Sequence, residues 1–262
     1  MTGADPTGTA RSLAVDPPPA PGRGPRVFCF HHAGGTASVF AGWQREVGSG
    51  VSVHPVQLPG RERRLHDEYP EDMAALVAGL DAELAPWLEA PHVFYGHSMG
   101  ALVAFALTRR RHSRGAPLPE ALVTGAFGDP AAPPPLEVVP SMSDDDLLDL
   151  LIGLGGMSDV VRRYPQWAGP ALALIRADLA LCTSFQAGPA VPMPVALHAF
   201  AGADDPLLDS SSVRAWGAHT AARFTADVVP GGHFFLADPV ARARVLAAVT
   251  APLTAAAGAR AR

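Results

Sequence analysis

The amino-acid sequence predicts an α/β fold in which helices cover both faces of a mostly parallel central sheet. Short apolar runs alternate along the chain with segments whose apolar residues recur at helical spacing, and this order is typical of a parallel sheet. One stretch interrupts the alternation, because residues 136–185 carry two helical patterns with no strand between them. Hydrophobic residues make up 48% of the 262 residues and charged residues 17%, so a large core can be buried. We therefore expect one domain with an inserted helical lid.

The first ordered element is expected only after a long irregular start. Residues 1–25 are rich in Pro, Gly, Ala and Thr, and this composition buries too little apolar surface to offset the entropy lost on ordering. We interpret them as a disordered N-terminal arm. Apolar runs bounded by Gly, Pro and polar residues then predict strands at residues 26–30, 51–56, 92–95, 121–125, 194–200 and 224–229. The domain is expected to cover residues 26–256, with a C-terminal tail at 257–262.

Helices are predicted from apolar spacing and from the residues that begin them. Residues 71–88 and 101–110 have helical patterns, and Asp238 followed by Pro239 is typical of the start of a closing helix. The lid, at about residues 136–185, contains Ser143 before three aspartates, which resembles a capping box. Its leucines can anchor the two helices to the core, and as a group they can also line an apolar chamber over an active site.

Charge and cysteine content limit the classes of function. The net charge of −5 gives no basic excess of the kind that nucleic-acid binding usually needs. Cys29 and Cys182 form neither a disulfide framework nor a C-x-x-C metal pair, so we expect two buried thiols in a reducing compartment. The first residues lack the features of a secretory signal, and no later stretch reaches the ~18 apolar residues of a membrane helix. We expect a cytoplasmic monomer that binds neither nucleic acid nor membrane.

The segment Gly96-His97-Ser98-Met99-Gly100 directly follows an apolar strand and directly precedes a predicted helix. This is the context of the G-x-S-x-G elbow of α/β-hydrolases, where the glycines relieve crowding around a strained serine at the carboxyl edge of the sheet. We therefore predict an α/β-hydrolase fold with Ser98 as the nucleophile. His97 is expected to be structural, because it points elsewhere if Ser98 points into the site.

A serine nucleophile needs a base and an orienting carboxylate, and in this fold they follow the serine in the order acid, histidine. His233 lies after the last strand and before the last helix, and it alone of the ten histidines has that placement. For the acid we prefer Asp205, which has G-x-x-D spacing in the loop after the fifth strand. Asp204 beside it, and Asp129 at the end of the preceding strand, remain alternatives.

The oxyanion that forms during acyl transfer needs two backbone donors. The amide of Met99, next to the nucleophile, is one candidate, and the loop after the first strand is placed to supply the other from Ala33. The adjacent His31 and His32 also invite a metal interpretation, but neighbours in a loop seldom chelate one ion and no third ligand is evident. We expect neither a metal nor a cofactor.

Taken together, the motifs resemble those of the stand-alone type II thioesterases that accompany modular polyketide synthases and nonribosomal peptide synthetases. The resemblance covers nearly the whole ordered chain. It rests on His32-Ala33-Gly34-Gly35, Leu58-Pro59-Gly60-Arg61-Glu62, Gly96-His97-Ser98-Met99-Gly100, Arg176-Ala177-Asp178, Gly202-Ala203-Asp204-Asp205-Pro206 and Gly232-His233-Phe234-Phe235. It implies a hydrolase that removes acyl groups from the phosphopantetheine thiol of acyl or peptidyl carrier proteins, editing or unloading a synthase.

Two other functions are compatible with these residues. A carboxylesterase or lipase acting on free esters would use the same triad. A binding protein of the same fold that has lost catalysis would be favoured by a missing triad member, and none is missing.

The resemblance also implies an acidic carrier partner whose arm begins with a phosphate, so a protein of charge −5 needs local basic groups to receive it. Arg61 and Arg64 follow the second strand at the carboxyl edge of the sheet, where open α/β sheets bind their ligands. We therefore expect Arg61 and Arg64 to contribute to a carrier-docking surface.

Overall fold

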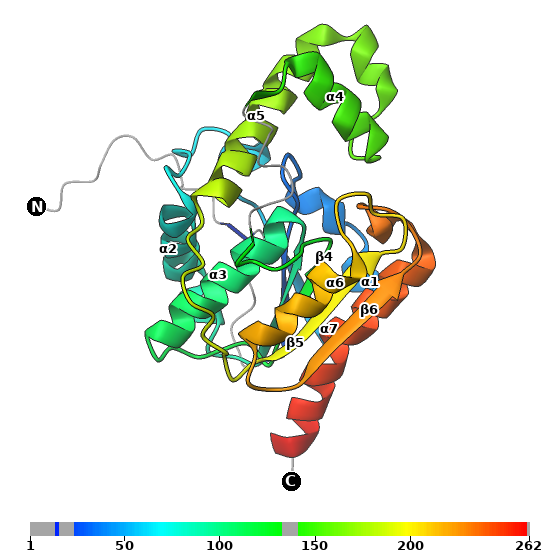
Figure 1. Cartoon of the computed structure of the whole chain (residues 1–262). Coiled ribbons are helices and arrows are strands. Elements are labelled where there is room, and N and C mark those ends of the chain that lie inside the picture. Colours follow the sequence, from blue (N-terminus) through cyan, green and yellow to red (C-terminus); the bar gives the residue numbers. More distant parts are fainter. Residues whose placement is uncertain (1–13, 16–23, 133–140, 261–262) are drawn as a thin grey trace, which may run out of the picture.

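The structure is a computed structural model that describes residues 14–15, 24–132 and 141–260, and its centre is a six-stranded sheet (Figure 1). The strand order is β2-β1-β3-β4-β5-β6, and each neighbouring pair is parallel. The strands are β1 (Arg26–Phe30), β2 (Ser52–Val56), β3 (His92–His97), β4 (Ala121–Gly125), β5 (Ala196–Gly202) and β6 (Phe224–Val229). The predicted α/β fold with a mostly parallel sheet is confirmed.

Helices cover both faces of this sheet, as the alternation of strands and helices predicts (Figure 1). On β1, Phe28 and Phe30 face one core while Val27 and Cys29 face the other, because successive strand residues point to opposite sides. The helices α2, α3 and α6 pack on the first face, and α1 and α7 on the second. Their bounds are α1 (Trp43–Val47), α2 (Met73–Leu84), α3 (Met99–Ser113), α6 (Ser210–Arg214) and α7 (Pro239–Arg260).

Short 3-10 helices connect several of these elements. They are η1 (Ala37–Phe40), η2 (Glu62–Arg64), η3 (Ala85–Trp87), η5 (Asp159–Arg163), η6 (Ala215–His219) and η7 (Phe235–Ala237). In the described part of the chain, no helix combines the length and the hydrophobicity needed to cross a bilayer.

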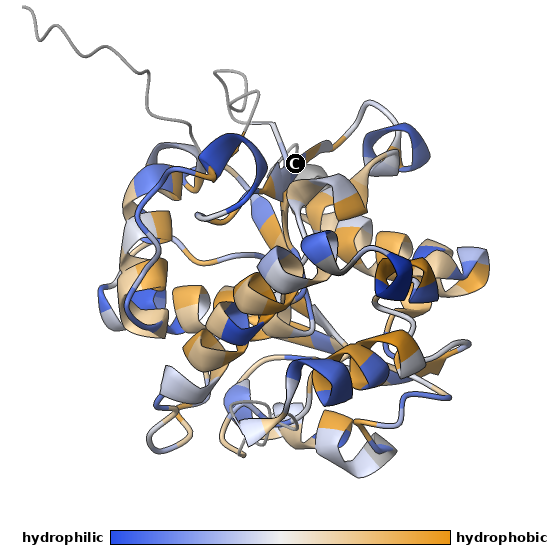
Figure 2. Ribbon diagram, turned by 90° about the horizontal axis from the view of Figure 1, so that it is seen from above, coloured by the Kyte–Doolittle hydropathy of each residue, from blue (hydrophilic) through white to orange (hydrophobic). Residues whose placement is uncertain are grey.

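The two helices expected between the fourth and fifth strands are present and project above the sheet (Figure 1). They are α4 (Asp144–Gly153) and α5 (Pro165–Ser184). The hydroxyl of Ser143 accepts a hydrogen bond from the amide of Asp146, which confirms the predicted cap. Leu147 and Ile175 belong to a separate apolar cluster that joins α4 to α5. Seen from above the sheet, both helices carry hydrophobic and hydrophilic residues (Figure 2). Residues 136–140 of the predicted lid lie outside the described residues.

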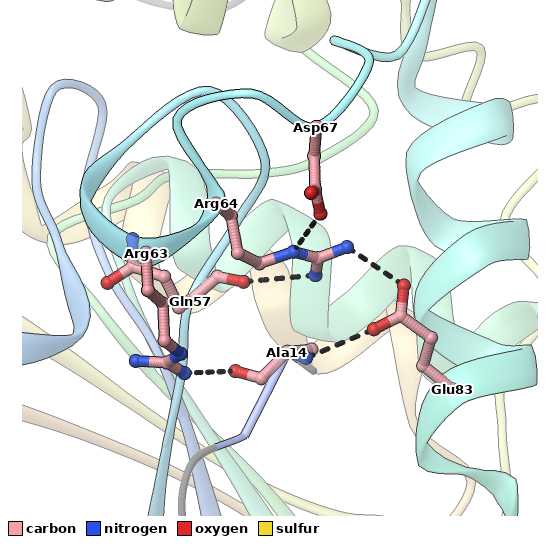
Figure 3. Close-up of polar contacts among 6 residues, drawn as sticks. All are labelled: Ala14, Gln57, Arg63, Arg64, Asp67 and Glu83. Atoms are coloured by element: carbon pink, nitrogen blue, oxygen red, sulfur yellow. Dashed lines mark hydrogen bonds and ion pairs between the residues drawn. The ribbon is translucent and has the colours of Figure 1, made fainter. Parts of the chain in front are cut away.

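Both expected ends of the domain need correction. Ala14 and Val15 fall in the predicted disordered arm, yet both are buried in the main core. The Ala14 backbone amide donates to the Glu83 carboxylate, and its carbonyl accepts from the Arg63 guanidinium (Figure 3). The same carbonyl also accepts from the backbone amide of Gln57. A composition averaged over 25 residues does not detect a short apolar pair that docks through its backbone. At the other end, α7 continues to Arg260, beyond the predicted limit at residue 256.

The close approach of α3 to β1 yields a stability prediction. A Cβ added at Gly100 would lie 2.1 Å from the Phe30 carbonyl oxygen, and this contact is with backbone that cannot rotate away. Gly100→Ala should therefore lower the free energy of unfolding by about 3 kcal/mol. The control is Gly79→Ala in α2, where the new methyl group meets open space. This change should raise the free energy of unfolding by at most about 1 kcal/mol. Equal unfolding midpoints in urea for the two variants would contradict the close packing.

Buried histidines yield a prediction about pH. Burial, reinforced by the Arg61 charge, lowers the pKa of His31 to about 3, and burial lowers the pKa of His92 to about 4. The unfolded chain, with histidine pKa values near ~6.5, therefore binds more protons than the folded protein below that pH. Stability present above about pH 6.5 should be lost on acidification, with a slope for each such histidine that rises to at most ~1.4 kcal/mol per pH unit as the pH falls below the unfolded pKa. Urea unfolding at pH 5.0 to 6.5 measures this slope. His92→Gln should reduce the slope by one histidine's share, and an unchanged slope would contradict the assignment.

Candidate active site

Ser98 stands at the turn between β3 and α3 with a backbone conformation that non-glycine residues rarely adopt. Its φ is 54° and its ψ is −122°, and such a conformation costs on the order of 1–3 kcal/mol unless surrounding contacts hold it. Two backbone hydrogen bonds hold it here, from the Ser98 amide to the Gly125 carbonyl at 2.7 Å and from the Ala101 amide to the Ser98 carbonyl at 2.8 Å. The sequence-predicted strand, turn and helix are therefore present around Ser98.

His233 lies within hydrogen-bonding distance of both Ser98 and Asp205. Its Nε2 atom is 3.0 Å from the Ser98 hydroxyl, and its Nδ1 atom is 2.9 Å from Asp205 Oδ2. The carboxylate is fully buried, and its second oxygen accepts a hydrogen bond from the Leu207 amide at 2.9 Å. Because a carboxylate only accepts, Nδ1 carries the proton and Nε2 is free to accept one from the serine. The three side chains follow β3, β5 and β6, whose carboxyl ends meet at one edge of the sheet.

The two alternative acids lie elsewhere. Asp204 is exposed, and its backbone amide donates to the Gly231 carbonyl at 3.0 Å. The carboxylate of Asp129 accepts hydrogen bonds from His219 Nε2 at 2.8 Å and from the Ala131 amide at 2.9 Å. The structure thus brings Asp205, the preferred candidate, to the imidazole of His233.

His97 is buried behind the site and binds the backbone of the loop that carries His233, residues 230–234 between β6 and η7, here called the histidine loop. Its Nε2 atom donates to the His233 carbonyl at 2.8 Å, and its Nδ1 atom accepts from the Tyr95 hydroxyl at 3.1 Å. Burial keeps the pKa of His97 well below its usual value, so the ring is neutral and has one donor and one acceptor. The structural role predicted for His97 agrees with these contacts. Sequence reasoning missed its partner, because the two residues are 136 positions apart.

The proposed oxyanion donors lie on two segments that flank Ser98. Met99 is the first residue of α3, and the first amides of a helix have no partner within the helix. The loop of residues 31–35 follows β1, the neighbour of β3. Within it the Gly35 amide donates to the His32 carbonyl at 3.0 Å, and the His32 ring packs edge-on against Phe234 with centroids 4.8 Å apart. The first-strand loop and the histidine loop therefore touch each other.

Burial of His32, with the nearby His233 adding to the effect, lowers the pKa of His32 to about 4, so this ring is neutral. His31 Nδ1 donates to the His32 carbonyl at 2.9 Å. Within the described ranges, no group of three or more His, Cys, Asp or Glu side chains is arranged to hold a metal ion.

The lid contacts both sides of the site. The Gly34 amide donates to Asp178 Oδ2 on α5 at 2.7 Å, which joins the lid to the first-strand loop. On the other side Gly156, in the segment after α4, lies so close to Phe234 that an added Cβ would be 2.6 Å from its ring. Since Phe234 follows His233 directly, the lid reaches the histidine loop as well.

The docking role predicted for Arg61 and Arg64 is wrong. These residues are only 3% and 2% exposed. Arg61 pairs with Asp178 at 2.6 Å, and Arg64 bonds with Asp67 at 2.6 Å and with Glu83 at 2.9 Å (Figure 3). Both side chains turn inward from the loop after β2. Arg61 pairs with the buried Asp178, and Arg64 pairs with the partly buried Asp67 and Glu83, so neither guanidinium lies on the surface that a carrier protein would meet.

The sequence and the fold are similar to those of known proteins. A family model for the thioesterase domain matches residues 25–251. The chain is 33% identical over 213 residues to the linear gramicidin dehydrogenase LgrE of Brevibacillus parabrevis, covering 80% of this chain and 81% of that protein. The thioesterase RedJ, from the prodiginine pathway of Streptomyces coelicolor, has a TM-score of 0.80 at 34% identity, covering 90% of this chain and 91% of that one.

The type II thioesterase BorB, from the borrelidin biosynthetic cluster, has a TM-score of 0.78 at 32% identity and covers 90% of this chain and 95% of that chain. The matched segment includes Ser98, Asp205 and His233. The chain therefore belongs to the thioesterase family, with an α/β-hydrolase fold, and is related to the type II thioesterases of polyketide and nonribosomal peptide pathways.

Proposed function

We propose that the protein is a serine thioesterase that hydrolyses acyl groups from the phosphopantetheine thiol of acyl or peptidyl carrier proteins and so edits or unloads a synthase. One observation carries the proposal: the continuous contacts from Ser98 through His233 to Asp205, at 3.0 and 2.9 Å, in a chain of the thioesterase family. No cofactor is needed for this chemistry.

The proposed reaction begins with attack of the Ser98 hydroxyl oxygen on the thioester carbonyl carbon. His233 Nε2 takes the hydroxyl proton as the new C–O bond forms, and Asp205 stabilises the resulting imidazolium while holding its orientation. The carbonyl oxygen becomes an oxyanion, which the amides of Ala33 and Met99 would stabilise. Each donor of this kind is worth about 10²–10³ in kcat.

Breakage of the C–S bond completes the first half of the reaction. His233 returns its proton to the departing sulfur, which leaves as the carrier's thiol, and the acyl group stays on Ser98 as an ester. Water then attacks this ester with His233 as base, and the serine is restored when the C–O bond to Ser98 breaks. Because the triad and both proposed donors come from one chain, we propose that a monomer is the catalytic unit.

The identity of the acid is tested by replacing each candidate carboxylate. Asp205→Asn should lower kcat by about 10⁴, because an amide can favour the wrong imidazole tautomer. Asp204→Asn and Asp129→Asn serve as matched controls, since neither carboxylate contacts His233, and both should keep kcat within about threefold of wild type by the same argument. Steady-state hydrolysis of a small acyl thioester measures all three. The assignment fails if Asp129→Asn is the most damaging change.

The nucleophile and the substrate class are tested together by intact-mass analysis of carrier proteins loaded with a panel of acyl groups. Wild-type protein should release the acyl group, whereas Ser98→Ala should be slower by up to ~10⁶, since it lacks the attacking oxygen. A free ester with the same acyl group is the comparison substrate. Faster hydrolysis of the ester than of the loaded carrier would favour a carboxylesterase instead. Undiminished hydrolysis by Ser98→Ala would rule out the proposed triad.

A further inference from the structure

Asp178 is a buried carboxylate on the lid helix α5 that the triad does not use. It is 0% exposed and accepts three hydrogen bonds. Oδ1 accepts from Arg61 Nη2 at 2.6 Å and from the Tyr69 hydroxyl at 2.6 Å, and Oδ2 accepts from the Gly34 amide at 2.7 Å. Burial and the charge of Asp178 keep the pKa of Tyr69 well above its usual value, so the phenol stays protonated and donates.

The contact at Gly34 is tight as well as polar. Gly34 has a φ of 72°, and an added Cβ would lie 2.4 Å from Ile175 Cγ1. Ile175 and Asp178 are three residues apart on α5 and therefore lie on the same face of the helix. This face of α5 lies directly against the backbone of the first-strand loop, with an apolar contact and a hydrogen bond side by side.

Gly34 and Ala33 belong to the same turn, residues 32–35, so a contact that holds Gly34 also restricts the direction in which the Ala33 amide points. The Gly35 amide donates to the His32 carbonyl, so the peptide plane between His32 and Ala33 is held at its oxygen. In a trans peptide the N–H points opposite to the C=O, and the Ala33 amide is thereby directed away from the interior of the turn. Asp178 holds the next amide, that of Gly34, and so limits rotation of the turn as a whole.

The helix that carries Asp178 belongs to two apolar clusters. Leu172 and Ile175 pack in the lid cluster, whereas Leu181 and Cys182 pack in the main core. Asp178 lies between these two sets, at the point where α5 passes from the core to the lid. Its position therefore depends on how α5 is seated.

We propose that Asp178 is a positioning residue through which the lid helix sets the oxyanion hole. When α5 is seated, Asp178 fixes the turn of residues 32–35 and directs the Ala33 amide at the developing oxyanion. When α5 moves away, this donor loses its orientation. Acyl transfer is thus coupled to closure of the lid. The inference rests on the proposed function.

The test is steady-state kinetics of Asp178→Asn on a small N-acetylcysteamine thioester, which avoids any effect of carrier docking. We expect kcat to fall about 10–100-fold with KM within about threefold, because a donor is misaligned and not removed. The inhibition constant of a trifluoromethyl ketone, which forms a tetrahedral adduct with the serine, should rise in parallel with the loss in kcat/KM. The pH profile of kcat/KM should keep its shape, because the triad contacts are untouched.

The matched control is Asp144→Asn, which removes the exposed lid ion pair with Arg176 and lies outside the first-strand loop. It should leave kcat and inhibitor binding unchanged within about twofold, as expected for an exposed pair. If kcat and the inhibition constant of folded Asp178→Asn match those of the wild type, or if Asp144→Asn causes the same loss, the proposal is overturned.

Asp178→Asn can fail to fold, because it leaves the buried charge of Arg61 without its carboxylate. A second pair of variants covers that case. Arg61→Gln alone keeps the Asp178 carboxylate that accepts from the Gly34 amide. Arg61→Gln combined with Asp178→Asn removes both charges of the pair, so neither charge is left buried without a partner. The double variant should have kcat about 10-fold or more below Arg61→Gln, and equal values overturn the proposal. Ser98→Ala is assayed in parallel. Hydrolysis by Ser98→Ala means that the proposed function fails, whereas an inactive Ser98→Ala beside fully active Asp178 variants means that only the lid coupling fails.

Discussion

The left-handed backbone of Ser98 is the constraint on which the site depends. A residue with a φ of 54° between a strand and a helix lifts its side chain above the sheet edge, and no ordinary turn would do the same. The conformation persists because β4 accepts the Ser98 amide and because α3 lies close enough to β1 that only a glycine fits at position 100. The packing of α3 against the sheet therefore holds Ser98, the proposed nucleophile, in place.

The other site residues are placed by the order of the strands. Asp205 and His233 follow β5 and β6, which are hydrogen-bonded neighbours, and so their loops emerge side by side. His97, at the end of β3, then binds the backbone of the histidine loop. Each contact is short, yet each joins residues between 28 and 136 positions apart, because parallel strands bring distant segments to the same edge.

In the loop after β2, burial changes the role that can be assigned to the charged residues. Arg61 and Arg64 read as a basic patch in the sequence, but each reaches an acidic partner within the fold. Removing one partner of a fully buried pair such as Arg61–Asp178 typically costs about 3–5 kcal/mol, because the other charge is left uncompensated. These arginines attach the loop to the lid and to α2. Their contribution is to the architecture around the site.

The sequence by itself determined the six parallel strands, the long helices and the identities of Ser98 and His233 as candidates, because periodicity, turn residues and the elbow motif are local signals. The short helices α1 and α6 span five residues each, too few turns for a periodic pattern, and were not predicted. Only the tertiary structure decided that Asp205 and not Asp204 or Asp129 reaches the imidazole, that Ala14 and Val15 are buried, and that Asp178 binds the first-strand loop. Each of these depends on the direction of a side chain or backbone group toward a partner far along the chain, and no local pattern encodes that direction.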